Sequence, residues 1–190
     1  MSAADIAKAA AAAKAHALAE AEAEAVAKAE AKAHAEQELR RRDPSYTWCH
    51  IRPTNIWGPG HPSFAGSIWK YLDRRYYLHP MTREPVIRCY GYVTNAVAQL
   101  LSLMQAPSER IHRDVFYLAD GCIDSSLWLD AFSMEFNHKR TRRMPHGVLK
   151  IFAAIGDSLK SAGLPAPLES GRLMRMTTSY PVPLENTLEI

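Results

Sequence analysis

From Arg40 onward, apolar residues follow two alternating patterns along the chain. Continuous apolar runs at Tyr46–Ile51 and Asp114–Ala119 predict buried strands of the parallel type, and Val86–Arg88 also indicates extended chain. Other apolar residues return every three or four positions, which is typical of amphipathic helices. We expect such helices over Ser63–Leu72, from Thr94, and from Ser125 or Ser126. A last helix is expected to start at Pro145 and to be ended by Gly163 and the following Pro165. Strands that alternate with helices predict an α/β fold.

Two of these helices carry a clear apolar face. The helix from Thr94 places Val97, Leu100, Leu101 and Met104 on one side. The helix from Pro145 does the same with Val148, Leu149, Phe152, Ile155 and Leu159. The tail from Gly171 has no strong signal of its own.

Residues 1–36 follow a different pattern, dominated by alanine. The segment contains 19 alanines, and neither glycine nor proline occurs before Pro44. Alanine has the highest helix propensity, so a long helix is expected, but the segment's only sizeable apolar residues are Ile6, Leu18 and Val26. We therefore divide the chain into an alanine-rich helical segment, 1–39, and a globular region, 40–190. The helix is either a solvated arm or an interaction helix.

Composition narrows the class of protein only a little. The net charge of +3 favours no particular partner, and nucleic acid is not expected because the arginine clusters are not interleaved with aromatic residues. The eight histidines lack metal-ligand spacing. Three cysteines without a Cys-x-x-Cys pair argue against a disulfide scaffold and for a reducing compartment. No apolar run is long enough to span a membrane, so we expect a cytoplasmic protein.

The run Ile51–Gly60 reads IRPTNIWGPG and joins an apolar strand to a turn rich in proline and glycine. Any α/β protein can contain such a turn. The run nevertheless resembles the Arg-Pro-x-Asn motif of the extended short-chain dehydrogenase/reductase family, which includes NAD-dependent nucleotide-sugar epimerases and dehydratases. The resemblance implies that Pro53, Thr54 and Ile56 lie along the nicotinamide and that Asn55 hydrogen-bonds the substrate.

A second segment, Val86–Ala96, reads VIRCYGYVTNA and resembles the same family's Arg-x-x-x-Tyr-Val-x-Asp/Asn-x-Ala motif. The resemblance implies that Arg88 pairs with the diphosphate of a nucleotide sugar, a role that suits a planar guanidinium. The alternative is a surface arginine beside a strand. Thr94 and Asn95 depart from the acidic residues often found there, and Asn95 also fits relatives similar to 3β-hydroxysteroid dehydrogenases. The resemblance extends over roughly residues 32–187.

The segment before Arg40 matches the family less well. Lys32-Ala33-His34-Ala35-Glu36 resembles the stretch that begins with the family's catalytic lysine, which makes Lys32 the candidate catalytic residue. Lysine, at Lys28, stands where the family has its catalytic tyrosine, and Lys32 is otherwise one solvated charge among several. The first glycine is Gly58, so the glycine-rich turn that holds a dinucleotide pyrophosphate does not precede this region.

The sequence thus predicts a remnant of a Rossmann-type fold, made of the last strands and the small C-terminal substrate domain, behind an alanine-rich helix. The parent family uses NAD or NADP, whereas we expect this chain to bind neither and to be inactive. One hypothesis is an inactive relative of nucleotide-sugar epimerases that still binds a nucleotide sugar. The other is a non-catalytic protein that self-associates, because the family's seven-stranded sheet gives the strand Tyr46–Ile51 more neighbours than this sequence supplies.

Overall fold

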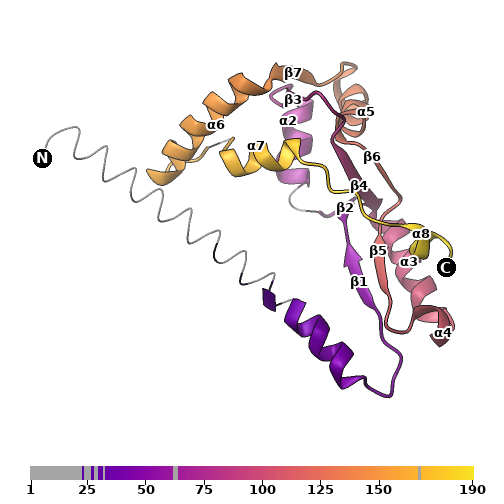
Figure 1. The fold of residues 1–190 in the computed structure, drawn as a ribbon. Helices are drawn as coiled ribbons and strands as arrows, with labels where there is room; N and C mark the ends of the chain where they lie inside the picture. Colours follow the sequence, from indigo (N-terminus) through magenta and orange to yellow (C-terminus); the bar gives the residue numbers. More distant parts are fainter. Residues whose placement is uncertain (1–22, 24–26, 28–29, 32, 62–63, 167) are drawn as a thin grey trace, which may run out of the picture.

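The computed structural model describes residues 23, 27, 30–31, 33–61, 64–166 and 168–190. Residues 33–42 are helical and lead into a mixed α/β fold with parallel strand pairs, as the sequence predicts (Figure 1). The strands are β1 (His50–Pro53), β2 (Asn55–Trp57), β3 (Leu78–Met81), β4 (Ile87–Tyr92), β5 (Val115–Leu118), β6 (Gly121–Asp124) and β7 (Arg142–Pro145). The helices are η1 (Phe64–Trp69), α2 (Lys70–Asp73), α3 (Val93–Gln105), α4 (Ser108–Ile111), α5 (Ser125–Asn137), α6 (His146–Ser161), α7 (Ser170–Thr177) and α8 (Glu185–Leu188).

Within the described residues the strands form three small sheets. β1 pairs with β5 in parallel, β4 lies between parallel β2 and antiparallel β6, and β3 pairs with β7 in parallel. The segment from β1 to β2 passes from the first sheet to the second at Thr54. The backbone N–H and the hydroxyl of Thr54 both donate to the carbonyl oxygen of Leu118, at 3.2 and 2.9 Å. This double hydrogen bond fixes the crossing point.

The first core lies between α3 and the strands. It consists of Ala96, Leu103, Phe116 and Leu118, with Ile56 packed against it. Gly91 of β4 makes the close approach possible, because a Cβ there would lie 2.9 Å from Cδ1 of Ile56 and 3.2 Å from Cα of Ala119. Any larger residue at position 91 would push β4 away from this core.

A second core joins α6, α7 and the β3–β7 sheet. Its buried members are Leu149, Ala153 and Leu173, and Leu78 and Met144 pack against them. α6 meets the segment before α7 at Gly156, where a Cβ would overlap the carbonyl oxygen of Leu168. This part of the fold therefore depends on glycine for its packing distance.

The predicted elements are confirmed in part. The helices from Ser125 and Pro145 are present as α5 and α6, and the strand Asp114–Ala119 is present as β5. The strand predicted over Tyr46–Ile51 instead begins at His50 and ends at Pro53. Trp48 is buried without being in a strand, which explains why an apolar run appeared there.

The apolar residues that share a face on two helices are mostly exposed. On α3, Val97, Leu101 and Met104 are 50, 50 and 74% exposed, while Ala96 and Leu103 are buried. On α6 only Leu149 of the five expected residues is buried. Each helix turns a narrower face with small residues inward, since the sheets beneath them are only two or three strands wide.

The expectation of unbridged cysteines is wrong for one pair. Cys89 of β4 and Cys122 of β6 form a disulfide, and the antiparallel register places these two residues directly opposite each other. Cys49 is free. The pairing of β4 with β6 brings together two cysteines that are 33 positions apart in the sequence. The spacing of the cysteines alone did not indicate this pairing.

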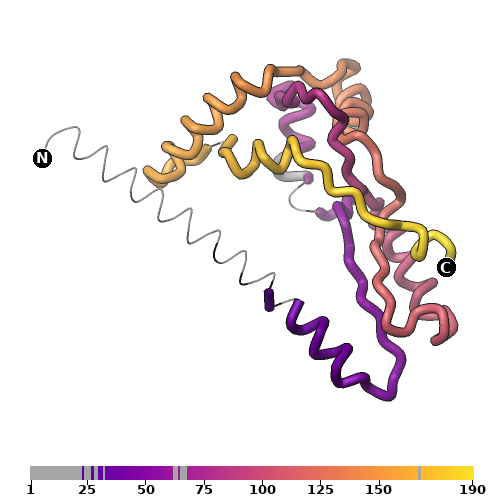
Figure 2. Tube along the Cα trace, viewed as in Figure 1, coloured from indigo at the N-terminus to yellow at the C-terminus, as the bar shows by residue number. Residues whose placement is uncertain are grey.

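The C-terminal tail, which had no strong signal, is ordered against the sheet. After α7 the chain crosses beside β4 on its way to α8 (Figure 2). The N–H of Tyr180 donates to the carbonyl oxygen of Ile87 at 3.0 Å, and Tyr180 bridges Arg88 as a parallel partner. In the part of the chain that the structure describes, no helix combines the length and apolar character needed to cross a membrane.

Candidate functional site

The register of β2 against β4 brings two predicted substrate-binding positions to one face. Asn55 lies opposite Tyr90, and Trp57 lies opposite Tyr92. Because side chains alternate along a strand, these residues share a face with Arg88, two positions before Tyr90. Arg88 and Tyr90 are half-buried, whereas the alternate positions of β4 are buried in the core. We call this side of β2, β4 and β6, part of which Trp128 of α5 covers, the sheet face.

Asn55 is held in place by the neighbouring strand. Its Nδ2 donates to the carbonyl oxygen of Cys89 at 2.8 Å, and the side chain is half-buried. With the amide nitrogen committed to the backbone, a ligand on the sheet face would meet the acceptor Oδ1. Asn55 therefore has both a structural contact and an atom that suits a sugar hydroxyl.

Arg88 lies near Asn55 on the same face. Its guanidinium lies 4.9 Å from the ring centroid of Tyr180, a cation–π contact that orients the side chain. Tyr90 lies roughly 7 Å further along the strand. Burial raises the pKa of Tyr90 to about 12, and this effect outweighs the positive charge of Arg88, which lowers it. Tyr90 thus keeps its proton at neutral pH and can donate a hydrogen bond.

Aromatic rings cover part of the sheet face. Trp128 of α5 stacks on Tyr90 with ring centroids 4.1 Å apart and an interplanar angle of 2°. The ring centroid of Trp57 lies 5.0 Å from that of Phe132 and 6.4 Å from that of Trp69. We call Trp57, Trp69, Tyr90, Trp128 and Phe132 the aromatic cluster. All five are half-buried, so the cluster forms a wall beside the polar groups rather than a closed core.

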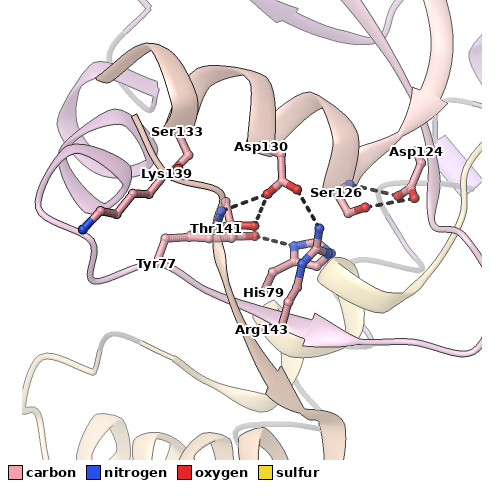
Figure 3. A network of polar contacts seen from close by, with 9 residues as sticks. All are labelled: Tyr77, His79, Asp124, Ser126, Asp130, Ser133, Lys139, Thr141 and Arg143. Atoms are coloured by element: carbon pink, nitrogen blue, oxygen red, sulfur yellow. Dashed lines mark hydrogen bonds and ion pairs between the residues drawn. The ribbon is translucent and has the colours of Figure 1, made fainter. Parts of the chain in front are cut away.

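A polar network lies on another side of α5 (Figure 3). One carboxylate oxygen of Asp130 accepts the N–H of Thr141 at 2.9 Å and also its hydroxyl, and the other accepts Nη2 of Arg143 at 2.9 Å. Burial by itself would raise the pKa of Asp130, but the hydrogen bonds from Thr141 and the charge of Arg143 lower it below its usual value. Asp130 is therefore a buried carboxylate that stays ionised.

The network approaches the sheet face through Tyr77 and His79. His79 is 2% exposed and lies opposite Arg143 in the β3–β7 register. Burial and the neighbouring Arg143 lower the pKa of His79 to about 4, so its ring is neutral at pH 7. The Tyr77 hydroxyl lies 3.4 Å from Nδ1 of His79, and the side chains of Tyr77, His79 and Arg143 lie together in Figure 3.

Tyr77 connects the two groups of polar residues electrostatically. Burial raises the pKa of Tyr77 above its usual range, while the charges of Arg143, Arg172 and Arg88 act in the opposite direction. These arginines come from β7, α7 and β4, and Arg143 is already paired with the carboxylate of Asp130.

The residues assigned to the nicotinamide lie along the crossing between sheets. Thr54 uses its hydroxyl on Leu118, and Ile56 packs against the α3 core. Pro53 ends β1 in an exposed position. By themselves these three residues offer a nicotinamide little polar contact, and their assignment stays a prediction. Lys32 lies outside the described residues.

Sequence reasoning missed Tyr77, His79, Asp130 and Arg143. None of them belongs to a spaced motif, and the pairing of β3 with β7 that assembles them was not predicted. The mixed sequence around Arg143 indicated only a charged loop. A weak signal was Asp130 itself, an acidic residue in a helix whose neighbours Leu129 and Ser133 are also buried.

Comparison with known proteins shows a similarity of structure without a similarity of sequence. No family model matches the sequence, and no curated protein matches it. The chain is similar to the crystal structure of gox2253, with a TM-score of 0.50 and 11% identity over 78% of this chain and 45% of that chain. It also matches the aureusimine biosynthetic cluster reductase domain (TM-score 0.45, 10% identity, 80% and 45% covered). A third match is the PbgP3 protein from Burkholderia pseudomallei (TM-score 0.38, 12% identity, 70% and 45% covered).

At such low identity the similarity is one of fold. The protein has a mixed α/β fold with parallel strand pairs, similar to part of the gox2253 structure. The chain spans a little under half of the length of the three structures it matches.

Proposed function

We propose that the region 40–190 binds a nucleoside diphosphate sugar on the sheet face. The observation that carries this proposal is the strand register, which places Asn55, Arg88 and Tyr90 on one face of the sheet. These three supply an acceptor, a cation and a hydroxyl donor within a few residues of each other.

The diphosphate suits Arg88, whose guanidinium lies over the Tyr180 ring, 4.9 Å from its centroid. Guanidinium groups bind phosphate oxygens through paired N–H donors, and such charge-assisted bonds are stronger than neutral ones. The sugar would then lie toward Asn55, whose Oδ1 accepts a hydroxyl proton.

Hydride transfer is not proposed because the chemistry for it is incomplete in this sequence. No tyrosine precedes Tyr46, and the first glycine is Gly58, beyond the segment that resembles the catalytic helix. Two functions of the parent family, dinucleotide binding and proton transfer by tyrosine, thus have no residues here that match their motifs. Substrate contact is the function that the described residues support.

A flat apolar substrate is a second candidate, favoured by the aromatic cluster. Five half-buried rings beside Asn55 and Arg88 give a planar molecule such as a 3β-hydroxysteroid an extended apolar contact. The arginine side chains distinguish the two candidates, since a neutral steroid has no group that uses Arg88.

Calorimetric titration of the full chain with UDP-glucose, UDP, a 3β-hydroxysteroid and NADH tests the proposal. We expect UDP-glucose and UDP to bind, and Arg88→Ala to weaken both by roughly 10- to 100-fold through loss of a charge-assisted contact. Arg83→Ala is the matched control, because Arg83 is an exposed arginine in the preceding loop. It should leave both affinities unchanged.

The other outcomes decide against parts of the proposal. Steroid binding that is unaffected by Arg88→Ala would replace the nucleotide sugar by the second candidate. Saturable NADH binding would show that the chain also holds a dinucleotide. If the folded wild-type chain bound none of the four compounds, the proposed binding function would be wrong.

A further inference from the structure

The disulfide between β4 and β6 is accessible from one end only. Cys89 is 1% exposed, whereas Cys122, on the edge strand β6, is exposed. Thiols attack a disulfide at a sulfur that they can reach, so Cys122 is the point of entry for a reductant. All three cysteines lie in the described part of the chain, and Cys49 is free. A single disulfide with an exposed end is typical of a redox-sensitive bond rather than of a disulfide scaffold.

Both sulfurs contact residues 179–184, which we call the tail segment. Sγ of Cys89 lies 3.9 Å from the carbonyl oxygen of Tyr180, and Sγ of Cys122 lies 3.8 Å from that of Val182. The tail segment crosses beside β4 at this point (Figure 2). The disulfide is therefore part of the surface on which the tail segment lies.

The same residues position two side chains of the sheet face. The guanidinium of Arg88 lies over the ring of Tyr180, 4.9 Å from its centroid. The N–H of Tyr180 in turn donates to the carbonyl oxygen of Ile87 at 3.0 Å. The carbonyl oxygen of Cys89 accepts Nδ2 of Asn55 at 2.8 Å. The geometry of Arg88 and Asn55 thus depends on β4 and on the docking of the tail segment.

We propose that the Cys89–Cys122 disulfide is a redox switch, which fixes the tail segment on β4 when it is formed and loosens it when it is reduced. The closed bond ties the edge strand β6 to β4, and Leu184 packs in the same small core as Cys89. Reduction leaves β6 on its short antiparallel ladder, and the two sulfurs move apart to van der Waals distance. Because Cys89 is enclosed by the core, this displacement acts on Cys122 and on the tail segment in contact with it.

The reductant is a small thiol such as glutathione. Its thiolate attacks Sγ of Cys122 and forms a mixed disulfide, while Cys89 leaves as a thiolate. A second thiolate attacks the thiol's own sulfur in the mixed disulfide and releases Cys122. Two thiols are thereby oxidised to their disulfide, and the protons they lost pass to the two cysteines. Burial and the charge of Asp114 raise the pKa of Cys49, so this third cysteine is a poor competing nucleophile.

Hydrogen exchange of the oxidised and the reduced full chain, followed by mass spectrometry, tests the switch. We expect reduction to speed the exchange of amides in the tail segment and β6 at least roughly 10-fold, and that of α6 by less than about twofold. α6 belongs to the separate core with Leu149 and Leu173. Cys122→Ser cannot form the bond and should behave like the reduced wild type whether or not the thiol is present. Cys49→Ser is the matched control and should respond to the thiol as the wild type does.

Titration of both forms with UDP-glucose measures the effect on the sheet face, and this part rests on the proposed function. We expect the reduced wild type and Cys122→Ser to bind roughly 10-fold more weakly than the oxidised wild type, because Arg88 and Asn55 lose their fixed geometry. Equal affinities of the two forms would overturn this effect. If neither form binds UDP-glucose, the proposed function is wrong, and the exchange of the tail segment still decides whether the switch exists.

Three results would overturn the switch itself. The first is an oxidised wild type in which an alkylating reagent still labels Cys122. The second is exchange of the tail segment that reduction leaves unchanged. The third is an equal increase in exchange over the tail segment and α6, since a disulfide that stabilises only the whole fold would produce that pattern.

Discussion

Helices α5 and α6 are similar in length and bury opposite kinds of residue. α5 buries Asp130 and Ser133 while Leu127 and Met134 are 58 and 45% exposed. α6 buries small and apolar residues on one side and exposes apolar residues on the other, which we call the α6 stripe: Val148, Ile151, Phe152, Ile155 and Leu159. Hydrophobic periodicity alone would bury the α6 stripe.

The difference shows where each helix finds its partners. The polar groups of α5 are satisfied within the chain, by Thr141 and Arg143 for Asp130 and by the carbonyl oxygen of Lys139 for Ser133. Such buried polar groups are stable only when their hydrogen bonds are complete. The apolar face of α6 has no comparable cover in the described part of the chain. The contacts of α5 are therefore complete within the described chain, whereas α6 keeps an exposed apolar face there.

Removing the carboxylate of α5 should have the largest effect. Asp130→Ala leaves the N–H of Thr141 buried without its acceptor and Arg143 without its counter-charge, so we expect a loss of about 3 kcal/mol in the free energy of unfolding. Asp130→Asn keeps an acceptor and should lose less. Urea denaturation measures both. A loss below about 0.5 kcal/mol for Asp130→Ala would show that the network does not stabilise the fold.

Acid should weaken the same region through His79. The folded pKa of about 4 lies below the ordinary value of 6.5, so the unfolded chain binds a proton more readily than the folded one. Stability is then complete above pH 6.5 and is lost as the pH falls toward 4. We expect the free energy of unfolding to be about 2 kcal/mol lower at pH 5 than at pH 7. His79→Gln should remove most of this dependence in denaturation measured at both pH values, and an unchanged slope would contradict the assignment.

The inner side of α6 can be broken without touching its exposed stripe. Gly156→Ala places a methyl group against the backbone of Leu168, and we expect a loss of about 1.5 kcal/mol from overpacking. Gly147→Ala on the same helix is the matched control, since nothing lies within 4 Å of a Cβ there. It should be neutral or slightly stabilising. Equal effects of the two substitutions on the melting temperature would argue against the close contact.

The smallest change in stability should come from the α6 stripe itself. Ile155→Ser alters an exposed residue, so the unfolding free energy of the monomer should change by less than about 0.5 kcal/mol. Urea denaturation measures this change. A loss above about 1 kcal/mol would show that Ile155 is covered in the folded protein and would remove the distinction between α5 and α6.

The two motif segments were the best guides to the candidate site. The run Ile51–Gly60 and the segment Val86–Ala96 indicated Asn55 and Arg88, and the structure brings these residues to one face. Their roles toward a substrate stay predictions. The aromatic cluster and the network around Asp130 could not be read from the sequence, because their members come from helices and strands that are adjacent only after β3 pairs with β7 and α5 packs on the sheet face.

The sequence by itself determined the α/β class, the positions of α5, α6 and β5, and the residues of the two motifs. These depend on local properties: periodicity, helix-terminating glycine and proline, and short motifs read within a few residues. The tertiary structure decided which face of each helix is buried, which cysteines are joined, and how Tyr77, His79 and Arg143 meet. Those features depend on strand pairings between distant segments, and the free energy of such contacts is set by partners that no local pattern contains.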